Sequence, residues 1–310
     1  MLKKLYVGSA FFLFFVSLLI GIDRFVHHKS SHFSLDKITS YHQYSSEWEI
    51  PAPSEEEQKL VDSILAQKFT YFSKGSQAQV YISEDQKYIL KFLKQTKLRP
   101  KSWLAYIPLS FNPYYQERLL KQKKHRATFH ACKTAFSELK KESGLIYLHL
   151  NRSNKFNKKV VIFDKSGKKH LVDISKTSFY LQKRAQLIYS RISELMHQGE
   201  VEEAKKIITS VFSLIDFLGR KGVVDNDPIL RKNFGLIDDV AVQIDIGKMR
   251  IDPIRQQNYA YRQEVASITR SFKTWLEKNY PQLTEHFENR LQETLFPRQQ
   301  IEGIQEETAV

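Results

Sequence analysis

The stretch that decides the fold runs from Gly222 to Met249 and reads GVVDNDPILRKNFGLIDDVAVQIDIGKM. Asp227 opens a polar loop and Asn233 closes it, while Asp245 follows an apolar alternation at 240–244 that is typical of a strand. Magnesium prefers oxygen ligands, and an ionised carboxylate can also accept a proton. The spacing of these side chains therefore indicates a site for a metal ion and phosphate.

The order of these residues resembles the catalytic loop and the magnesium motif of the protein-kinase-like superfamily. The resemblance implies that Asp227 is the catalytic base and that Asn233 and Asp245 hold magnesium against the phosphates of ATP. Asn233 follows Asp227 by six positions, one more than in the family motif. Asp245-Ile246-Gly247 stands where the family has Asp-Phe-Gly. A plain surface turn is the competing interpretation, because Asp, Asn and Pro all favour turns.

A second stretch, Phe69 to Phe92, reads FTYFSKGSQAQVYISEDQKYILKF and predicts β-rich runs joined by the turn Ser-Glu-Asp-Gln. It resembles the glycine-rich loop and the strand lysine of the same superfamily. The resemblance implies that Gly75 and Val80 belong to a nucleotide-binding loop. It also implies that Lys91 reaches the ATP phosphates, whereas an isolated lysine would be expected to point to water.

Two departures from the family pattern favour a second hypothesis. Ser73 and Ala78 occupy the outer glycine positions of the loop, where glycine lets the backbone approach phosphate closely. The sequence after Met249 has neither an Ala-Pro-Glu motif nor a long activation segment. The alternative to an active phosphotransferase is therefore a catalytically silent pseudokinase that acts as a scaffold at a membrane.

A helix is predicted over residues 127–142, with Phe129, Cys132, Phe136 and Leu139 on one face. By the resemblance, a glutamate on this helix should pair with Lys91, and Glu138 is preferred to Glu142 because Glu142 is close to Gly144. A surface carboxylate is the competing interpretation. Cys132 is the only cysteine, so no internal disulfide can form.

The predicted fold class is α+β, a protein-kinase-like two-lobe fold that follows an N-terminal transmembrane helix. Short β-rich runs at 159–163, 170–174 and 178–183 would complete a small antiparallel, five-stranded sheet lobe over residues 54–183. A strong helical period from residue 200 to 218 begins a reduced helical lobe over residues 184–298.

The N-terminal residues predict a membrane anchor. Tyr6–Ile22 is an uncharged apolar run of 17 residues after Lys3 and Lys4, and no convincing cleavage site follows it. Residues 1–23 are thus expected to be a retained transmembrane anchor rather than a cleaved signal, and residues 24–53 a polar stalk. The expected localisation is single-pass membrane, with the side of the soluble domain undetermined because basic residues flank both ends.

Residues 94–126 are predicted to be an insertion rich in basic and aromatic side chains, in a chain of net charge +14. This composition suits an anionic lipid surface or nucleic acid. Lipid is favoured over nucleic acid because of the predicted anchor, and a solvated insertion is the third possibility. Residues 299–310 are expected to form a disordered acidic tail.

The sequence as a whole predicts a membrane-anchored, kinase-like domain that binds ATP and magnesium and that, if active, transfers phosphate. A basic protein that binds lipid or nucleic acid without kinase chemistry is a further alternative. The phosphate acceptor and the oligomeric state do not follow from the sequence.

Overall fold

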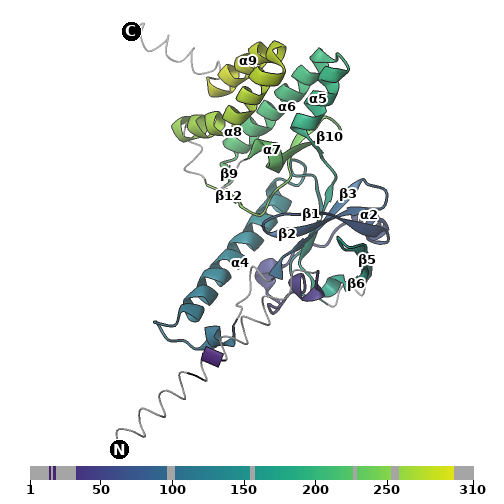
Figure 1. Cartoon of the computed structure of the whole chain (residues 1–310), viewed down its shortest axis with the longest axis vertical. Helices are drawn as coiled ribbons and strands as arrows, with labels where there is room; N and C mark the ends of the chain where they lie inside the picture. Colours follow the sequence, from purple (N-terminus) through teal and green to yellow (C-terminus); the bar gives the residue numbers. More distant parts are fainter. Residues whose placement is uncertain are drawn as a thin grey trace, which may run out of the picture.

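A computed structural model describes residues 14, 17–18, 33–95, 102–153, 158–225, 229–252 and 258–296. The chain has a mixed α+β fold, with a sheet-rich lobe followed by a helical lobe. Figure 1 shows helices α5, α6, α8 and α9 gathered at one end of the molecule, the sheet in the middle, and the long helix α4 running from the junction of the lobes away from the helices. The predicted α+β class is confirmed.

The larger sheet has seven strands in the order β4-β7-β3-β2-β1-β5-β6. The strands are β1 (Lys68–Lys74), β2 (Ala78–Ser83), β3 (Tyr88–Leu93), β4 (Leu145–His149), β5 (Lys159–Phe163), β6 (Lys169–Asp173) and β7 (Phe179–Lys183). All neighbours are antiparallel except β1 and β5, which are parallel. The prediction of five strands, all antiparallel, is therefore wrong: the run before the Ser-Glu-Asp-Gln turn forms two strands, β1 and β2, β4 adds a further strand, and β5 runs parallel to β1.

Each face of this sheet has its own apolar core, because successive side chains of a strand point to opposite faces. Leu90 and Phe92 of β3 belong to a core that includes helix α2 (Glu55–Leu65), whereas Leu93 belongs to the core that includes helix α4 (Pro113–Glu138). By this alternation, Lys91 projects to the α4 side. Helix α2 begins with a capping box between Ser54 and Glu57.

Residues 33–53, predicted to belong to a stalk, pack on the sheet-rich lobe. They include the short 3-10 helices η1 (Leu35–Lys37) and η2 (Ser46–Trp48). Ile38 is fully buried in the α2-side core, and the Trp48 ring lies 5.3 Å from the Phe129 ring, centroid to centroid. These apolar side chains are too widely spaced to form a periodic pattern, which explains why the sequence suggested a linker.

The predicted insertion at 94–126 is largely helical where the structure describes it. Helix α4 starts at Pro113 with Asn112 as its N-cap, fourteen residues before the predicted start at 127. A 3-10 helix, η3 (Trp103–Tyr106), precedes it. The early part of α4 carries many basic residues and little apolar periodicity, so the sequence pattern did not reveal it. Residues 96–101 lie outside the described residues.

The helical lobe contains α5 (Ile188–His197), α6 (Val201–Arg220), α7 (Leu230–Asn233), α8 (Asn258–Asn279), η6 (Pro281–Leu283) and α9 (Thr284–Leu295). Short strands connect them: β8 (Gln186–Leu187), β9 (Val223–Asp225), β10 (Phe234–Ile237), β11 (Val240–Gln243) and β12 (Met249–Ile251). Strands β11, β10 and β8 form one small sheet, and β12 pairs with β9 in another. The apolar face of α6 lies in the same core as α4, which joins the two lobes.

The predicted single-pass membrane localisation is contradicted. Within the described part of the chain, every helix is too short or too polar to cross a membrane. Only residues 14, 17 and 18 of the predicted anchor Tyr6–Ile22 are described; the rest of it and the predicted tail at 299–310 lie outside the described residues.

Candidate functional site

Lys91 is the central side chain of the site. It lies on β3, between β2 and β7, opposite Val80 on one side and Tyr180 on the other. Its Nζ donates a hydrogen bond to the backbone carbonyl of Ile244 at 2.7 Å and lies 5.5 Å from the centroid of the Tyr180 ring. The lysine of the sheet-rich lobe thus contacts the segment that follows β11 in the helical lobe.

The charge of a carboxylate acts on this lysine. Burial lowers the pKa of Lys91 to about 8, and the negative charge of Asp245 opposes that shift. The Asp245 charge also helps to raise the pKa of Cys132 to about 12, after burial. Lys91 of the sheet, Cys132 of helix α4 and Asp245 of the β11–β12 connection are therefore close enough to interact electrostatically.

Asn233 is held next to the segment that carries Asp245. It ends the short helix α7, is buried, and its carbonyl accepts a hydrogen bond from the backbone N–H of Ile244 at 2.7 Å. The Asp245 carboxylate accepts a long hydrogen bond of 3.4 Å from the Gly247 N–H. Two oxygen-bearing side chains that the sequence places twelve positions apart are thus brought to neighbouring backbone positions. Asp227 lies outside the described residues.

The loop between β1 and β2, which contains Gly75, covers this segment. Lys94 is buried, its Nζ donates a hydrogen bond to the Gly75 carbonyl, and its N–H donates to the Gln77 carbonyl at 2.8 Å. The Gln77 side chain lies directly on Gly247, where a Cβ would overlap the Gln77 Oε1. A larger residue at position 247 would therefore displace the Gln77 side chain from this place.

Glu138 does not pair with Lys91. It is exposed at the end of α4, where the Lys221 Nζ donates to its backbone carbonyl at 3.0 Å and lies 3.5 Å from its carboxylate. The predicted pair fails because Glu138 projects from the solvent side of α4, whereas Cys132 faces the core and interacts electrostatically with Lys91. Helix α4 thus presents a thiol where the resemblance predicted a carboxylate.

Several residues that support the site were not predicted. The Gln243 Nε2 donates to the Asp225 carboxylate at 2.8 Å, and Asp225 lies opposite Met249 in the β9–β12 pair. Ile246 is fully buried in the core that joins the lobes, which fixes the residues on either side of it. No sequence motif includes Lys94, Gln77 or Gln243, so their role in the site follows only from their contacts in the structure.

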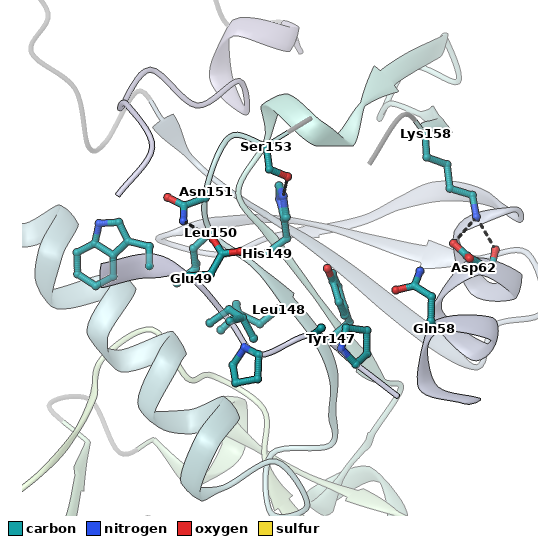
Figure 2. A pocket seen from close by; sticks show the side chains of 15 residues that line it. Glu49, Gln58, Asp62, Tyr147, Leu148, His149, Leu150, Asn151, Ser153 and Lys158 are labelled. Carbon is teal, nitrogen blue, oxygen red and sulfur yellow. Dashed lines mark hydrogen bonds and ion pairs between the residues drawn. The ribbon is translucent and has the colours of Figure 1, made fainter. Parts of the chain in front are cut away.

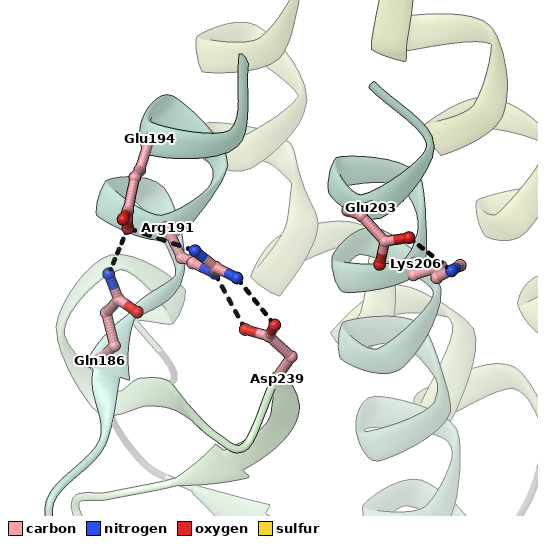
Figure 3. Close-up of polar contacts among 6 residues, drawn as sticks. All are labelled: Gln186, Arg191, Glu194, Glu203, Lys206 and Asp239. Carbon is pink, nitrogen blue, oxygen red and sulfur yellow. Dashed lines mark hydrogen bonds and ion pairs between the residues drawn. The ribbon is translucent and has the colours of Figure 1, made fainter. Parts of the chain in front are cut away.

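The β10–β11 hairpin, which leads into Ile244 and Asp245, is fastened to helix α5. Figure 3 shows the Arg191 guanidinium with two hydrogen bonds, at 3.0 and 2.9 Å, to the carboxylate of Asp239 at the tip of the hairpin. The same guanidinium lies 3.4 Å from Glu194, which accepts a hydrogen bond from Gln186 of β8. These contacts are exposed, so they orient the hairpin more than they stabilise it.

A separate pocket of about 510 Å³ lies at the outer edge of the sheet, between β4 and residues 48–53. Figure 2 shows that several of its polar side chains contact one another. The Lys158 Nζ lies 2.7 Å from the Asp62 carboxylate, and His149 Nε2 lies 3.2 Å from the Ser153 hydroxyl. This pocket contains none of the residues that the sequence predicted for the site.

Comparisons with known proteins assign no family. No family model and no curated protein matches the sequence. Among solved structures, the chain is similar to the bifunctional kinase-methyltransferase WbdD, with 13% identity and a TM-score of 0.31 over 69% of this chain and 42% of that one. For a structure of monomeric WbdD the identity is 15% and the TM-score 0.32, over 72% of this chain and 45% of that one. For the complex of Rv3197 with erythromycin, from Mycobacterium tuberculosis, the identity is 15% and the TM-score 0.33, over 77% of this chain and 60% of that one. The chain spans about half the length of these structures.

Proposed function

We propose that this chain is a protein-kinase-like domain that binds ATP with magnesium and transfers a phosphoryl group to an acceptor hydroxyl. The observation that carries the proposal is the contact between Lys91 of the sheet and the Ile244 carbonyl, one residue before Asp245. A lysine nitrogen removed from water is costly unless a negative group accompanies it. Here the Ile244 carbonyl and the Asp245 charge supply only part of that compensation, since the pKa of Lys91 still falls to about 8. Phosphate oxygens would supply the rest.

The donor set fits magnesium. Mg²⁺ in nucleotide sites is commonly held by one or two side-chain oxygens together with substrate phosphates and water. Asn233 and Asp245 provide those two side chains, and the described residues contain no cluster of three His, Cys, Asp or Glu that would favour a dedicated all-protein metal site. When bound, magnesium would neutralise charge on the phosphates.

The remaining roles follow from position. Lys91 would hold the phosphates from the sheet side, and the loop around Gly75 would close over them, with Lys94 as a second cation beneath it. Asp227 stays the predicted base for the acceptor hydroxyl, because it belongs to the loop that ends at Asn233. The phosphoryl group would pass from ATP to the acceptor oxygen, and the hydroxyl proton to the Asp227 carboxylate.

The experiment measures nucleotide binding and turnover on the same variants. Asp245→Ala should abolish magnesium-dependent ATP binding in calorimetry, whereas Asp227→Ala should bind ATP but hydrolyse or transfer it at least about 100-fold more slowly. Asp216→Ala is the matched control, because Asp216 lies on α6 in an ion pair with Arg220, away from the site. It should behave as the wild type in both assays.

The outcomes separate three functions. Binding together with turnover supports the phosphotransferase. Binding without turnover makes the chain a pseudokinase scaffold, a result that the thiol at Cys132 in place of a helix carboxylate would help to explain. A wild-type chain that melts cooperatively but does not bind ATP contradicts the proposal.

A further inference from the structure

A second cleft, of about 630 Å³, opens beside the Lys91–Asp245 site. It lies between the β1–β2 loop, one face of helix α4, and residues 247–251 that follow Asp245. Its lining residues include Gln77, Lys124, Thr128, Gly247, Lys248 and Arg250. Lys91 and Asp245 do not line it. The cleft is therefore a neighbour of the proposed nucleotide site, and the two meet at Gln77 and Gly247.

The charge of this cleft has one sign. Three lining residues, Lys124, Lys248 and Arg250, are cations, and the described residues that line it include neither Asp nor Glu. Clefts lined by charge of one sign concentrate ligands of the opposite sign. The potential of this cleft therefore favours anions.

Glu47 is a carboxylate that binds two side chains of helix α4. It lies 3.1 Å from the His130 Nε2 and 3.0 Å from the Arg126 guanidinium. Arg250 Nη2 lies 3.9 Å from the Asp252 carboxylate, and the Arg250 side chain is 54% exposed. At that distance and exposure the pair is weak, so the guanidinium can still bind an anion.

The rest of the lining suits a small polar molecule. Helix α4 presents Lys124, Thr128 and Ala131 on one face at helical spacing, so a cation, a hydroxyl and a small side chain line the same wall. The opposite wall carries Arg250, which the β9–β12 pairing holds in register with Val224. A volume of several hundred cubic ångströms is the usual size of a small-molecule site.

We propose that this cleft binds the phosphoryl acceptor, and that the acceptor is a small molecule that already carries a phosphate group. The existing phosphate would lie against Lys124 and Arg250, which directs a hydroxyl of the same molecule toward Gly247 and the Asp245 side of the cleft. This inference rests on the proposed phosphotransferase function, because a cleft beside a nucleotide site is an acceptor site only if phosphate is transferred. Arg250 supplies the planar, two-pronged donor that suits phosphate, and Lys124 supplies a point charge.

The test uses inorganic pyrophosphate as the probe and calorimetry on the full chain. Wild type should bind pyrophosphate, more weakly as salt rises. Lys124→Gln and Arg250→Gln should each weaken binding roughly tenfold. Lys205→Gln is the matched control, because Lys205 is a surface lysine paired with Glu202 on α6, and it should bind like the wild type. Glucose 6-phosphate against glucose then tests whether the phosphate group gives the affinity.

A second arm separates this inference from the proposed function. Asp245→Ala should keep pyrophosphate binding while it loses magnesium-dependent ATP binding, and wild type saturated with a non-hydrolysable ATP analogue should still bind pyrophosphate. Competition between the analogue and pyrophosphate, or loss of both in Asp245→Ala, would show that the cations serve the nucleotide's own phosphates and would overturn the acceptor site. Absence of pyrophosphate binding at low salt overturns it as well. Absence of ATP binding alone contradicts the proposed function and leaves an anion site.

Discussion

Lys91 and the pair formed by His42 and His125 are titratable nitrogen groups that burial affects, and they differ in what accompanies each group. Lys91 has a carbonyl oxygen at 2.7 Å and the Asp245 charge nearby. His42 and His125 lie with ring centroids 4.9 Å apart against Phe129, and within the described structure His42 Nδ1 and His125 Nε2 have no hydrogen-bond partner. Burial lowers the pKa at both places.

The difference separates a charged site from a neutral one. Burial, and secondarily His42, lowers the pKa of His125 to about 4, so the histidine pair is neutral at pH 7 and serves packing. Lys91, at about 8, keeps most of its charge at pH 7 because Asp245 offsets part of the burial. A compensated buried cation is the one expected to act on a ligand.

The largest effect should come from removing the compensated cation. Lys91→Met should cost about 4 kcal/mol of nucleotide binding, roughly a thousandfold in affinity. The same change should leave the free energy of unfolding unchanged or raise it, because an apolar side chain of similar length replaces a buried charge. Nucleotide calorimetry and urea unfolding on one preparation measure both quantities. Lys87→Met, an exposed lysine in the β2–β3 turn, is the control. A variant that loses stability together with binding would make Lys91 a structural residue.

The histidine pair should make the protein less stable in acid. A histidine whose pKa falls from 6.5 to about 4 on folding binds protons more tightly when unfolded. The free energy of unfolding is therefore unaffected by this histidine above about pH 6.5. It falls as the pH drops toward 4, by up to about 3 kcal/mol, because the unfolded chain takes up the proton first. Urea unfolding between pH 7.5 and pH 4.5 measures it. His125→Phe should flatten this part of the profile, whereas His197→Gln, at the exposed end of α5, should not. An unchanged slope in His125→Phe would assign the acid sensitivity elsewhere.

Alkali should instead remove the charge of Lys91 and so weaken nucleotide binding. Nucleotide affinity should fall as the pH rises above about 8, by about tenfold for each unit once Lys91 is mostly neutral. The bound phosphates raise the pKa of Lys91 in the complex, so the fall should appear in the affinity and hardly in the turnover of saturated protein. Lys91→Arg, which stays charged, should bind with a flat pH profile over this range. The same fall in Lys91→Arg would contradict the assignment.

The smallest effect should come from Cys132. Burial raises the pKa of its thiol to about 12, so the group is neutral at pH 7 and should react slowly with thiol reagents until the chain unfolds. Cys132→Ala should lower stability by about 1 kcal/mol and change nucleotide affinity little. Rapid labelling of the native chain would show that helix α4 separates from Lys91 more often than the packing suggests.

The sequence predicted best those elements whose signal is local. The strand at Lys159–Phe163 and the long helix Val201–Arg220 both match their patterns closely, since apolar periodicity acts within the element itself. The first half of α4 and the packing of Ile38 and Trp48 were missed. These segments are held by contacts with residues far away in the sequence, and such contacts do not produce a periodic pattern of apolar residues.

The types of residue in the candidate site could be predicted from the sequence, but which side chains contact one another could be predicted less well. The order of Lys91, Asn233 and Asp245 carries the resemblance, and the structure brings all three to one place. Glu138 failed because the side of α4 that faces Lys91 depends on how the helix is rotated about its axis, which one charged residue cannot indicate. Gln77 and Lys94 were overlooked because their role comes from the position of the loop above Gly247.

The most direct test of the Lys91–Asp245 nucleotide site is labelling with an ATP analogue that carries an acyl phosphate, followed by mass spectrometry of the modified lysines. A lysine with a pKa of about 8 is partly neutral at pH 8 and can attack the acyl group when it lies beside the phosphates. We predict that Lys91 is labelled, that excess ATP with magnesium prevents the labelling, and that Asp245→Ala, which should not bind the analogue, loses the labelling of Lys91. Labelling of surface lysines alone, at a rate that ATP does not change, would contradict the nucleotide site.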